Sequence, residues 1–195
     1  MDMPAQGISA TMEVLHIYPN HVFTKVEIPG MGSMTSGFDG ENAWSVNPMT
    51  GPRLSTGPEL EAMRQESDPA ASYTRQSSEI SSSETVEKTT IAGQECFKVK
   101  HTWKSGRVTF DCYAAADGLL IATQSKQNTP MGEIEMMSTL SGYKDFGGFK
   151  RATTMTQEIM GAQQIITISG WEWDNIDPKE MEVPAEIKAM LTKKQ

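Results

Sequence analysis

Apolar and polar residues alternate with a period of two along most of the chain. Ile8, Ala10, Met12, Val14 and His16 would share one face of an extended segment, with polar residues between them. Successive side chains of a strand point to opposite faces, so this pattern predicts a half-buried β-strand. The same alternation predicts further strands over 22–28, 34–38 and 43–46.

Turn residues separate these four segments. Pro19-Asn20, Pro29-Gly30 and Asp39-Gly40 each interrupt the alternation, and Asp-Gly is a strong hairpin signal. The connections are short, so strands that are neighbours in sequence are expected to be neighbours in space. The first part of the chain therefore predicts an antiparallel meander.

A second run of strands begins at Glu84 and continues to Trp173. The expected ranges are 85–91, 95–103, 107–114, 119–127, 132–143, 149–160 and 163–173. Short connections again predict antiparallel neighbours. The whole chain would hold roughly ten or eleven strands, and a single sheet of that length must curl, close or split.

Three segments depart from the strand pattern. Thr56 and Glu59 have the spacing of a capping box, and Leu60 and Met63 form a short apolar stripe, which predicts a helix to about residue 65. Residues 69–83 have few apolar anchors and predict a loosely packed segment at a rim, either a second helix or a mobile loop. Residues 184–191 predict a C-terminal helix that starts with a proline.

Charge and composition exclude several classes of protein. The 195 residues carry a net charge of −8 with an isoelectric point near 4.9. Nucleic acids and anionic lipid surfaces are bound mainly by basic faces, so neither is an expected partner. No run of about 18 apolar residues occurs, so no transmembrane helix is expected. The first residues, MDMPAQGIS, lack the basic and apolar regions of a signal peptide.

The two cysteines, Cys96 and Cys112, fall on neighbouring predicted strands. A two-residue turn between these strands would pair Cys112 with Val99 and place the two sulfurs on opposite faces. A disulfide would need a bulge or a register change, so the sequence favours two free, partly buried thiols and leaves the redox compartment open.

Candidate catalytic and metal-binding residues do not form a recognisable set. The three histidines, His16, His21 and His101, lack further ligands at zinc-site spacing, and no G-x-S-x-G or H-E-x-x-H motif occurs. Two carboxylate pairs, Glu133 with Glu135 and Glu172 with Asp174, alternate with apolar residues, as on a solvated strand face. We expect no enzyme activity, no metal and no cofactor. A hydrolase that uses the carboxylate pairs or His16 and His21 is one alternative hypothesis.

Methionine is unusually frequent, with 14 in the chain. Its flexible, polarisable side chain fills irregular cores and is common on surfaces that accept apolar ligands of variable shape. Plain core filling is one interpretation. The other is that some methionines line a cavity within a curved sheet.

Three stretches resemble bacterial outer-membrane lipoprotein-sorting (LolA/LolB-like) domains. They are GFDGENAWSVNPMTGP, AADGLLIATQSKQNTPMGEIEMMSTLSGYKDFGGFK and WDNIDPKEMEVPAEI. The resemblance extends from about Gly7 to Leu191 and rests on turn and strand signatures. The chain departs from the pattern at FKRATT, where such domains usually carry a proline, and it has no lipobox cysteine.

This resemblance implies a mainly β (α+β) fold in which a single curved antiparallel sheet forms a half-open β-barrel, with a short helical lid and a C-terminal helix. We expect one LolA-like domain over residues 1–195, with a flexible N-terminus over 1–6 and a lid insertion over 56–83. It also implies a non-catalytic carrier-like domain of the periplasm or cell envelope, whose partner is a hydrophobic ligand: an acyl chain, lipid or lipoprotein. The cargo and the oligomeric state stay open.

The ligand-binding cavity is predicted from apolar strand positions and from the lid. Its residues are Met12, Val14, Val26, Met34, Phe38, Trp44, Val46, Leu60 and Met63. The alternative is a structural or interaction domain whose interior is filled by its own side chains, either alone or as part of a larger envelope protein. A cavity of lipid size would separate the two.

Overall fold

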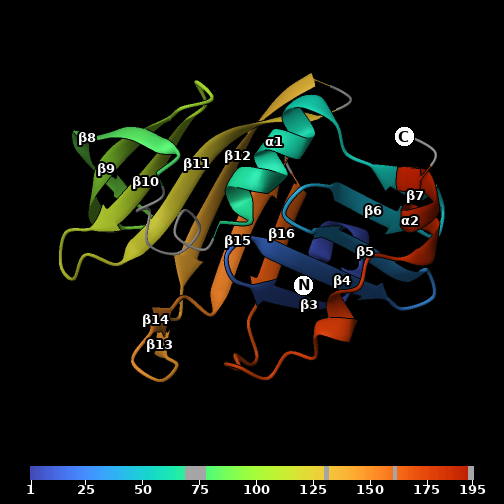
Figure 1. Cartoon of the computed structure of the whole chain (residues 1–195). Helices are drawn as coiled ribbons and strands as arrows, with labels where there is room; N and C mark the ends of the chain where they lie inside the picture. The colour runs from blue at the N-terminus through green and yellow to red at the C-terminus, as the bar shows by residue number, and fades with distance from the viewer. Residues whose placement is uncertain (69–77, 130–131, 160–161, 193–195) are drawn as a thin grey trace. The chain divides into compact units, whose positions relative to one another are not determined.

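A computed structural model describes residues 1–68, 78–129, 132–159 and 162–192 (Figure 1). The chain divides into two compact units. The first comprises Met1–Ile8 and Ser78–Trp171, and the second comprises Ser9–Ser77 and Glu172–Gln195. Each unit is described below by itself.

The first unit is built on a nine-stranded antiparallel sheet of order β2-β1-β16-β15-β12-β11-β10-β9-β8. Strands β8 to β16 follow each other as a meander, apart from a small hairpin, and β1 adds beside β16. The strands are β1 (Asp2–Met3), β2 (Ile8–Ser9), β8 (Ile80–Ile91), β9 (Gln94–Trp103), β10 (Val108–Ala114), β11 (Leu120–Thr129), β12 (Gly132–Ser141), β15 (Thr154–Ile159) and β16 (Ala162–Thr167). The small hairpin pairs β13 (Lys144–Asp145) with β14 (Lys150–Arg151), and a 3-10 turn η1 (Pro4–Gln6) lies against β16.

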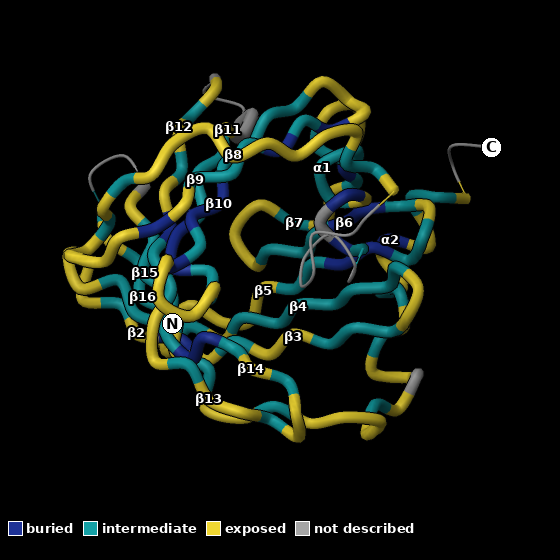
Figure 2. Tube along the Cα trace, turned by 90° about the vertical axis from the view of Figure 1, so that its left-hand side faces the viewer, coloured by how far each residue is buried: buried dark blue, intermediate teal, exposed yellow. Residues whose placement is uncertain are grey.

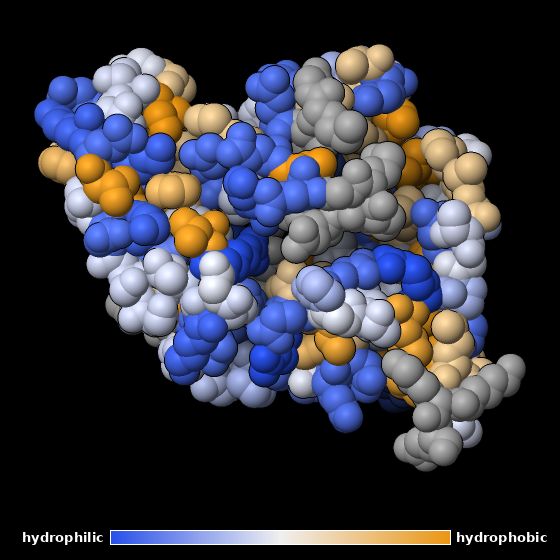
Figure 3. Space-filling model, turned by 90° about the horizontal axis from the view of Figure 1, so that it is seen from above, coloured by the Kyte–Doolittle hydropathy of each residue, from blue (hydrophilic) through white to orange (hydrophobic). Residues whose placement is uncertain are grey.

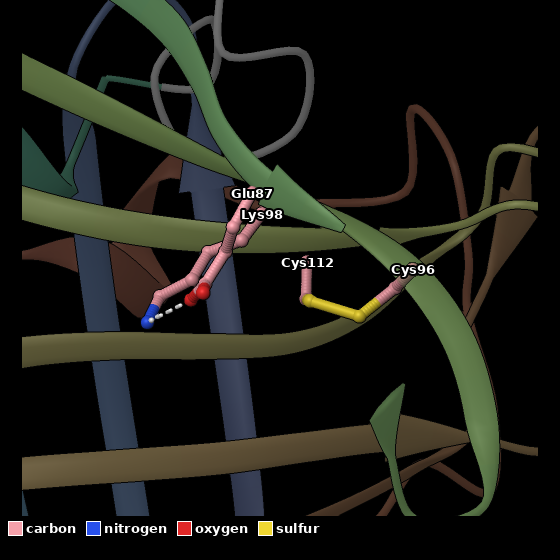
Figure 4. Close-up of a disulfide and its surroundings, with 4 residues drawn as sticks. All are labelled: Glu87, Cys96, Lys98 and Cys112. Atoms are coloured by element: carbon pink, nitrogen blue, oxygen red, sulfur yellow. Dashed lines mark ion pairs between the residues drawn. A yellow bond between two sulfur atoms is a disulfide. The ribbon is translucent and has the colours of Figure 1, made fainter. Parts of the chain in front are cut away.

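A disulfide joins Cys96 on β9 to Cys112 on β10 in the core of this unit (Figure 4). Cys112 lies opposite Lys98, so the two cysteines share a face and their Cα atoms are 5.6 Å apart, within the range of disulfides. The prediction of free thiols is therefore wrong. The loop at Gly106 holds three residues, because Trp103 N–H donates to the Arg107 carbonyl, and this shifts the register by one.

Small apolar residues surround the disulfide. Cys96, Cys112, Ala114, Ile121 and Ala122 form one buried cluster, against which Ile91 packs. Figure 2 shows the buried stretches of β9 and β10 in dark blue. Beside the disulfide, Lys98 Nζ pairs with Glu87 at 3.2 Å (Figure 4). The cluster holds little apolar volume, so we expect the disulfide to contribute much of this unit's stability.

Strand β8 forms one edge of this sheet and is irregular. Its pairing with β9 shifts register between Ile80 and Ser82 and again between Thr85 and Glu87, as at β-bulges. Most of its residues are exposed, and Glu84 and Glu87 form ion pairs with lysines of β9. The strand starts at Ile80, so the predicted loose segment is wrong for residues 80–83. Residues 69–77 of that prediction lie outside the described residues.

The second unit contains a five-stranded antiparallel meander of order β3-β4-β5-β6-β7. The strands are β3 (Thr11–Ile17), β4 (His21–Ile28), β5 (Gly32–Phe38), β6 (Ala43–Asn47) and β7 (Gly51–Leu54). Helix α1 (Gly57–Glu66) contacts β6, and α2 (Ala185–Thr192) contacts β7. A 3-10 turn η3 (Pro178–Met181) precedes α2.

Most predicted elements are confirmed to within a few residues. The strand predicted from Ile8 is divided into β2 and β3, which belong to different sheets, and the short elements β1, η1 and β13 were not predicted. Strand β7 was not predicted, since Pro52 interrupts it. The predicted strand 149–160 is divided into β14 and β15, and the strand predicted over 163–173 ends at Thr167.

The fold class is mainly β, with two α-helices and large antiparallel sheets. The described strands form two large sheets and one hairpin, whereas we predicted one continuous sheet. The half-open barrel and the single domain stay predictions. No helix among the described residues is both long and apolar enough to cross a membrane.

Candidate functional site

The register of the five-stranded sheet fixes which side chains share a face. Met12 lies opposite Val26, and Val26 lies opposite Met34, so these three form one apolar row across β3, β4 and β5. Val14 and Phe38 lie on the same face as this row, because each is an even number of residues away along its strand. We call this side the Met34 face; it carries Met12, Val14, Val26, Met34 and Phe38.

The opposite side of the same strands is organised around Trp44. Gly37 lies opposite Trp44, and Trp44 lies opposite Leu54. Phe23 pairs with Gly37, and its ring centroid is 5.8 Å from that of Trp44. We call this side the Trp44 face; it carries Phe23, Trp44, Val46 and Leu54.

The nine predicted cavity residues are therefore divided between three places. Five lie on the Met34 face, whereas Trp44 and Val46 lie on the Trp44 face, and Leu60 and Met63 lie on α1. Phe38 lies opposite Ala43 across the loop at 39–42. Any loop with an even number of residues between these strands would put Phe38 and Trp44 on opposite faces. Counting the loop residues as even was therefore enough to predict that the two side chains do not share a face.

The two faces differ in how completely they are covered. Trp44 is only 3% exposed, whereas Met34 is 36% and Val14 is 44% exposed. Phe38, at 1%, is the buried end of the Met34 face. The Met34 face thus has exposed apolar side chains at Met34 and Val14 and a buried one at Phe38, and the row of Val14 continues into the polar residues Thr24 and Ser36.

Indole packing explains why the Trp44 face is filled. A Cβ atom added at Gly37 would lie 2.6 Å from Cζ2 of Trp44 and 3.0 Å from the Val22 carbonyl oxygen. The ring therefore lies directly on the backbone of β5, where only glycine leaves room. This face is occupied by the chain's own side chains and offers no space to a ligand next to Gly37.

Helix α1 is attached to β7 by a bidentate ion pair. Arg53 Nη1 donates to Glu59 Oε2 at 2.7 Å, and Nη2 donates to Oε1. Arg53 lies opposite Ser45, on the side of the Met34 face. The hydrogen bond from Arg53 lowers the pKa of Glu59 below its ordinary value.

The same contact corrects the predicted capping box. Thr56 makes no side-chain hydrogen bond at the helix start, and Glu59 binds Arg53 rather than reaching back. The predicted apolar stripe is also less buried than expected: Leu60 and Met63 are half-buried, while Gln65 and Ser67 are buried. Gln65 donates to Glu61 within the helix at 2.9 Å.

The residues of the hydrolase hypothesis are not gathered. Ile17 lies opposite His21, which places His16 and His21 on opposite faces of the sheet. Glu133 is paired with Lys126 at 2.8 Å, and Glu172 accepts a hydrogen bond from Asn175 at 2.7 Å. Across the described ranges, no group of three or more His, Cys, Asp or Glu side chains is placed to hold a metal ion.

A hollow of about 360 Å³ lies in the first unit. It is lined by Gln94, Glu95, Ala114, Ala115 and Ala116 and opens to solvent. None of the nine predicted cavity residues lines it. Its lining of small and polar groups does not suit an acyl chain.

Comparison with solved structures gives the fold. A LolA-superfamily protein from Nitrosomonas europaea matches with a TM-score of 0.61 and 11% identity, over 89% of this chain and 81% of that one. A putative outer membrane lipoprotein-sorting protein domain from Vibrio parahaemolyticus matches with a TM-score of 0.56 and 11% identity, over 90% and 81%. A DUF1329 family protein from Desulfovibrio piger matches with a TM-score of 0.60 and 12% identity, over 90% and 82%.

The chain therefore has the fold of LolA-superfamily and lipoprotein-sorting domains, as the sequence resemblance predicted. No family model matches the chain, and no curated protein matches it in sequence. At 11–12% identity the likeness extends to the fold alone.

Proposed function

We propose that this protein is a carrier-like domain of the bacterial cell envelope, with a non-catalytic binding face that holds acyl chains of lipids or lipoproteins. The observation that carries the proposal is the Met34 face. Its row of Met12, Val26 and Met34 is apolar across three strands, yet Met34 and the neighbouring Val14 remain substantially exposed. An apolar strand face that the chain leaves incompletely covered is suited to a hydrophobic ligand.

Chemistry and fold both support this choice. Each methylene removed from water contributes about 0.8 kcal/mol, so an acyl chain laid along such a face gains affinity with length. Two methionines on this face would adapt to chains of different shape. The likeness to a lipoprotein-sorting domain supports the same class of ligand.

The disulfide supports an envelope location. Disulfides persist in oxidising compartments such as the bacterial periplasm and are rare in the cytosol. Cys96 and Cys112 are joined and buried, which suits a structural bond formed after export. The Met34 face and Leu60 with Met63 on α1 are our proposed binding residues.

Binding can be tested with palmitate and a fluorescent fatty-acid probe on the purified full chain. Native mass spectrometry and organic extraction should recover bound lipid, and palmitate should displace the probe. Met34→Gln should weaken probe binding about ten-fold, a change of about 1.4 kcal/mol. Thr35→Gln is the matched control, since Thr35 is the next residue of β5 and lies on the opposite face.

Two outcomes would contradict the proposal. If the wild-type protein binds neither lipid nor probe, the alternative of a self-filled structural or interaction domain is favoured. If Met34→Gln and Thr35→Gln weaken binding equally, binding occurs elsewhere than on the Met34 face.

A further inference from the structure

Three side chains on adjacent strands of the first unit form a continuous polar chain. Ser83 of β8 lies opposite His101 of β9, and its Oγ is 2.7 Å from Nδ1 of the imidazole. The other ring nitrogen, Nε2, is 3.3 Å from Oδ2 of Asp111 on β10. The order hydroxyl, imidazole and carboxylate is that of a catalytic triad, with the two ring nitrogens exchanged.

Burial differs along this chain of contacts. His101 and Asp111 are both almost completely buried, whereas Ser83 is exposed. The hydroxyl of Tyr113 also donates to Asp111, at 3.3 Å. A buried carboxylate oriented by a hydrogen bond, a buried imidazole and an accessible hydroxyl match the three roles of orienting group, base and nucleophile.

A base role for His101 toward Ser83 requires the tautomer with its proton on Nε2. An ionised carboxylate only accepts hydrogen bonds, so an ionised Asp111 is compatible with this tautomer. Nδ1 then presents its lone pair to the hydroxyl of Ser83. The contact between Nε2 and Asp111 is not well aligned for a hydrogen bond, as is common before a substrate is bound.

The position of Ser83 gives a substrate access to it. Strand β8 ends the sheet among the described strands, and an edge strand presents backbone N–H groups that can donate to an incoming oxyanion. Register shifts on both sides of Ser83 twist this edge locally. An extended or flexible acyl substrate can therefore approach Ser83 from the edge of the sheet.

We propose that Ser83, His101 and Asp111 form an acyl-transfer site for carboxylic esters. Ser83 Oγ attacks the ester carbonyl carbon while its proton passes to Nδ1 of His101. The C–O bond to the leaving alcohol breaks, the alcohol takes that proton, and an acyl-Ser83 ester remains. Water then attacks this ester by the same route, releasing the carboxylic acid and restoring Ser83.

This activity goes beyond the carrier function and does not depend on it. All three residues belong to the first unit, whereas the Met34 face belongs to the second. The competing interpretation is a structural polar network that links three strands. The two interpretations differ in whether Ser83 reacts faster than other exposed serines.

The first experiment treats the full chain with a fluorophosphonate probe and locates the adduct by peptide mass spectrometry. A single adduct on Ser83 is expected, with loss of fluoride. Ser83→Ala should abolish labelling, and Ser82→Ala, one residue away on the same exposed strand, should leave it unchanged. His101→Gln should slow labelling about 100-fold, the usual scale of general-base assistance.

A second measurement separates positioning from folding. Asp111 acts through His101, so its role is read from the ¹⁵N shifts of the ring nitrogens. The proton should lie on Nε2 in the wild-type protein and redistribute between the nitrogens in Asp111→Asn. Circular dichroism and an intact disulfide would show that each variant is folded.

Hydrolysis of p-nitrophenyl acetate completes the test. Wild-type protein should release nitrophenolate faster than Ser83→Ala, with acetyl-Ser83 detected as the intermediate. The proposal is overturned if no adduct forms on Ser83, or if a folded His101→Gln variant is labelled at the wild-type rate. If the wild-type protein does not bind palmitate but is still labelled at Ser83, only the carrier function is overturned.

Discussion

The two faces of the five-stranded sheet belong to the same strands, and yet their central apolar side chains differ in how far they are buried. On the Trp44 face an indole lies on Gly37 and beside Phe23, and no room is left next to Gly37. On the Met34 face the apolar row of Met12, Val26 and Met34 is left partly exposed at Met34. The buried indole stabilises the fold, whereas the exposed area around Met34 is the part that we propose for binding.

This difference teaches that apolar character alone does not identify a binding surface. Both faces carry apolar residues on β5 or β6, and our sequence prediction combined residues from both. Rigid, close-packed residues gain stability from contacts within the chain. Apolar side chains that stay exposed can still be buried by a ligand, and flexible methionines can adapt to its shape.

Removing the indole should have the largest effect on stability. Trp44→Ala should lower the free energy of unfolding by about 3–5 kcal/mol, because it leaves a cavity against β5. Urea unfolding followed by circular dichroism measures the change. Val46→Ala, on the same strand and face but half-buried, should cost clearly less. A loss below about 1 kcal/mol for Trp44→Ala would show that this face is not the filled one.

Overfilling the same face should have the next largest effect. Gly37→Ala places a methyl group 2.6 Å from the indole and should destabilise the protein by about 1–3 kcal/mol. Thermal unfolding is a sufficient measurement. Ser36→Ala, one residue earlier and on the other face, should change stability by less than about 0.5 kcal/mol. Equal effects of the two substitutions would contradict the packing described here.

Truncation of a side chain on the Met34 face should affect ligand binding more than it affects stability. Met34→Ala should cost less than about 1 kcal/mol of stability, since the side chain is already 36% exposed, but should weaken fatty-acid probe binding. Parallel urea titrations and probe titrations test both parts. A large stability loss with unchanged binding would make this face part of the core.

The link between α1 and the sheet should have the smallest effect and should depend on pH. The pKa of Glu59 is lowered in the folded protein, so its contribution is present above the carboxyl group's ordinary pKa and is lost as pH falls through the lowered one. Both side chains are well exposed, so Glu59→Gln should cost only about 0.5 kcal/mol at neutral pH.

Unfolding measured across acidic and neutral pH tests this sign. The difference between wild type and Glu59→Gln should vanish in acid. The double variant with Arg53→Gln should show that the two losses are not additive. If the difference in unfolding free energy between wild type and Glu59→Gln grows as pH falls, the ion pair between Arg53 and Glu59 does not cause it.

Alternation along the chain was enough to predict most strands, because a half-buried sheet requires it. It did not predict β7, where Pro52 breaks the pattern in an edge strand. The disulfide was missed because strand register depends on the loop between the strands. A three-residue loop, with Gly106 at φ 83°, reversed the relation of Cys96 to Cys112.

Candidate sites were harder to predict than strands because they depend on register across several strands. Parity could have separated Trp44 from Phe38. No such rule could have placed Ser83 beside His101, since the register shift between Thr85 and Glu87 of β8 decides that contact. The pairing of neighbouring strands therefore decides which of their side chains meet, and the residue pattern of a single strand does not reveal this pairing.

The irregular course of β8 has a consequence for the behaviour of the protein at high concentration. A long, straight and neutral edge strand would recruit a second molecule and seed fibrils. Two register shifts and the charges of Glu84, Glu87 and Lys88 make this edge a poor template. Straightening β8 or neutralising these charges should turn a dispersed protein into one that self-assembles.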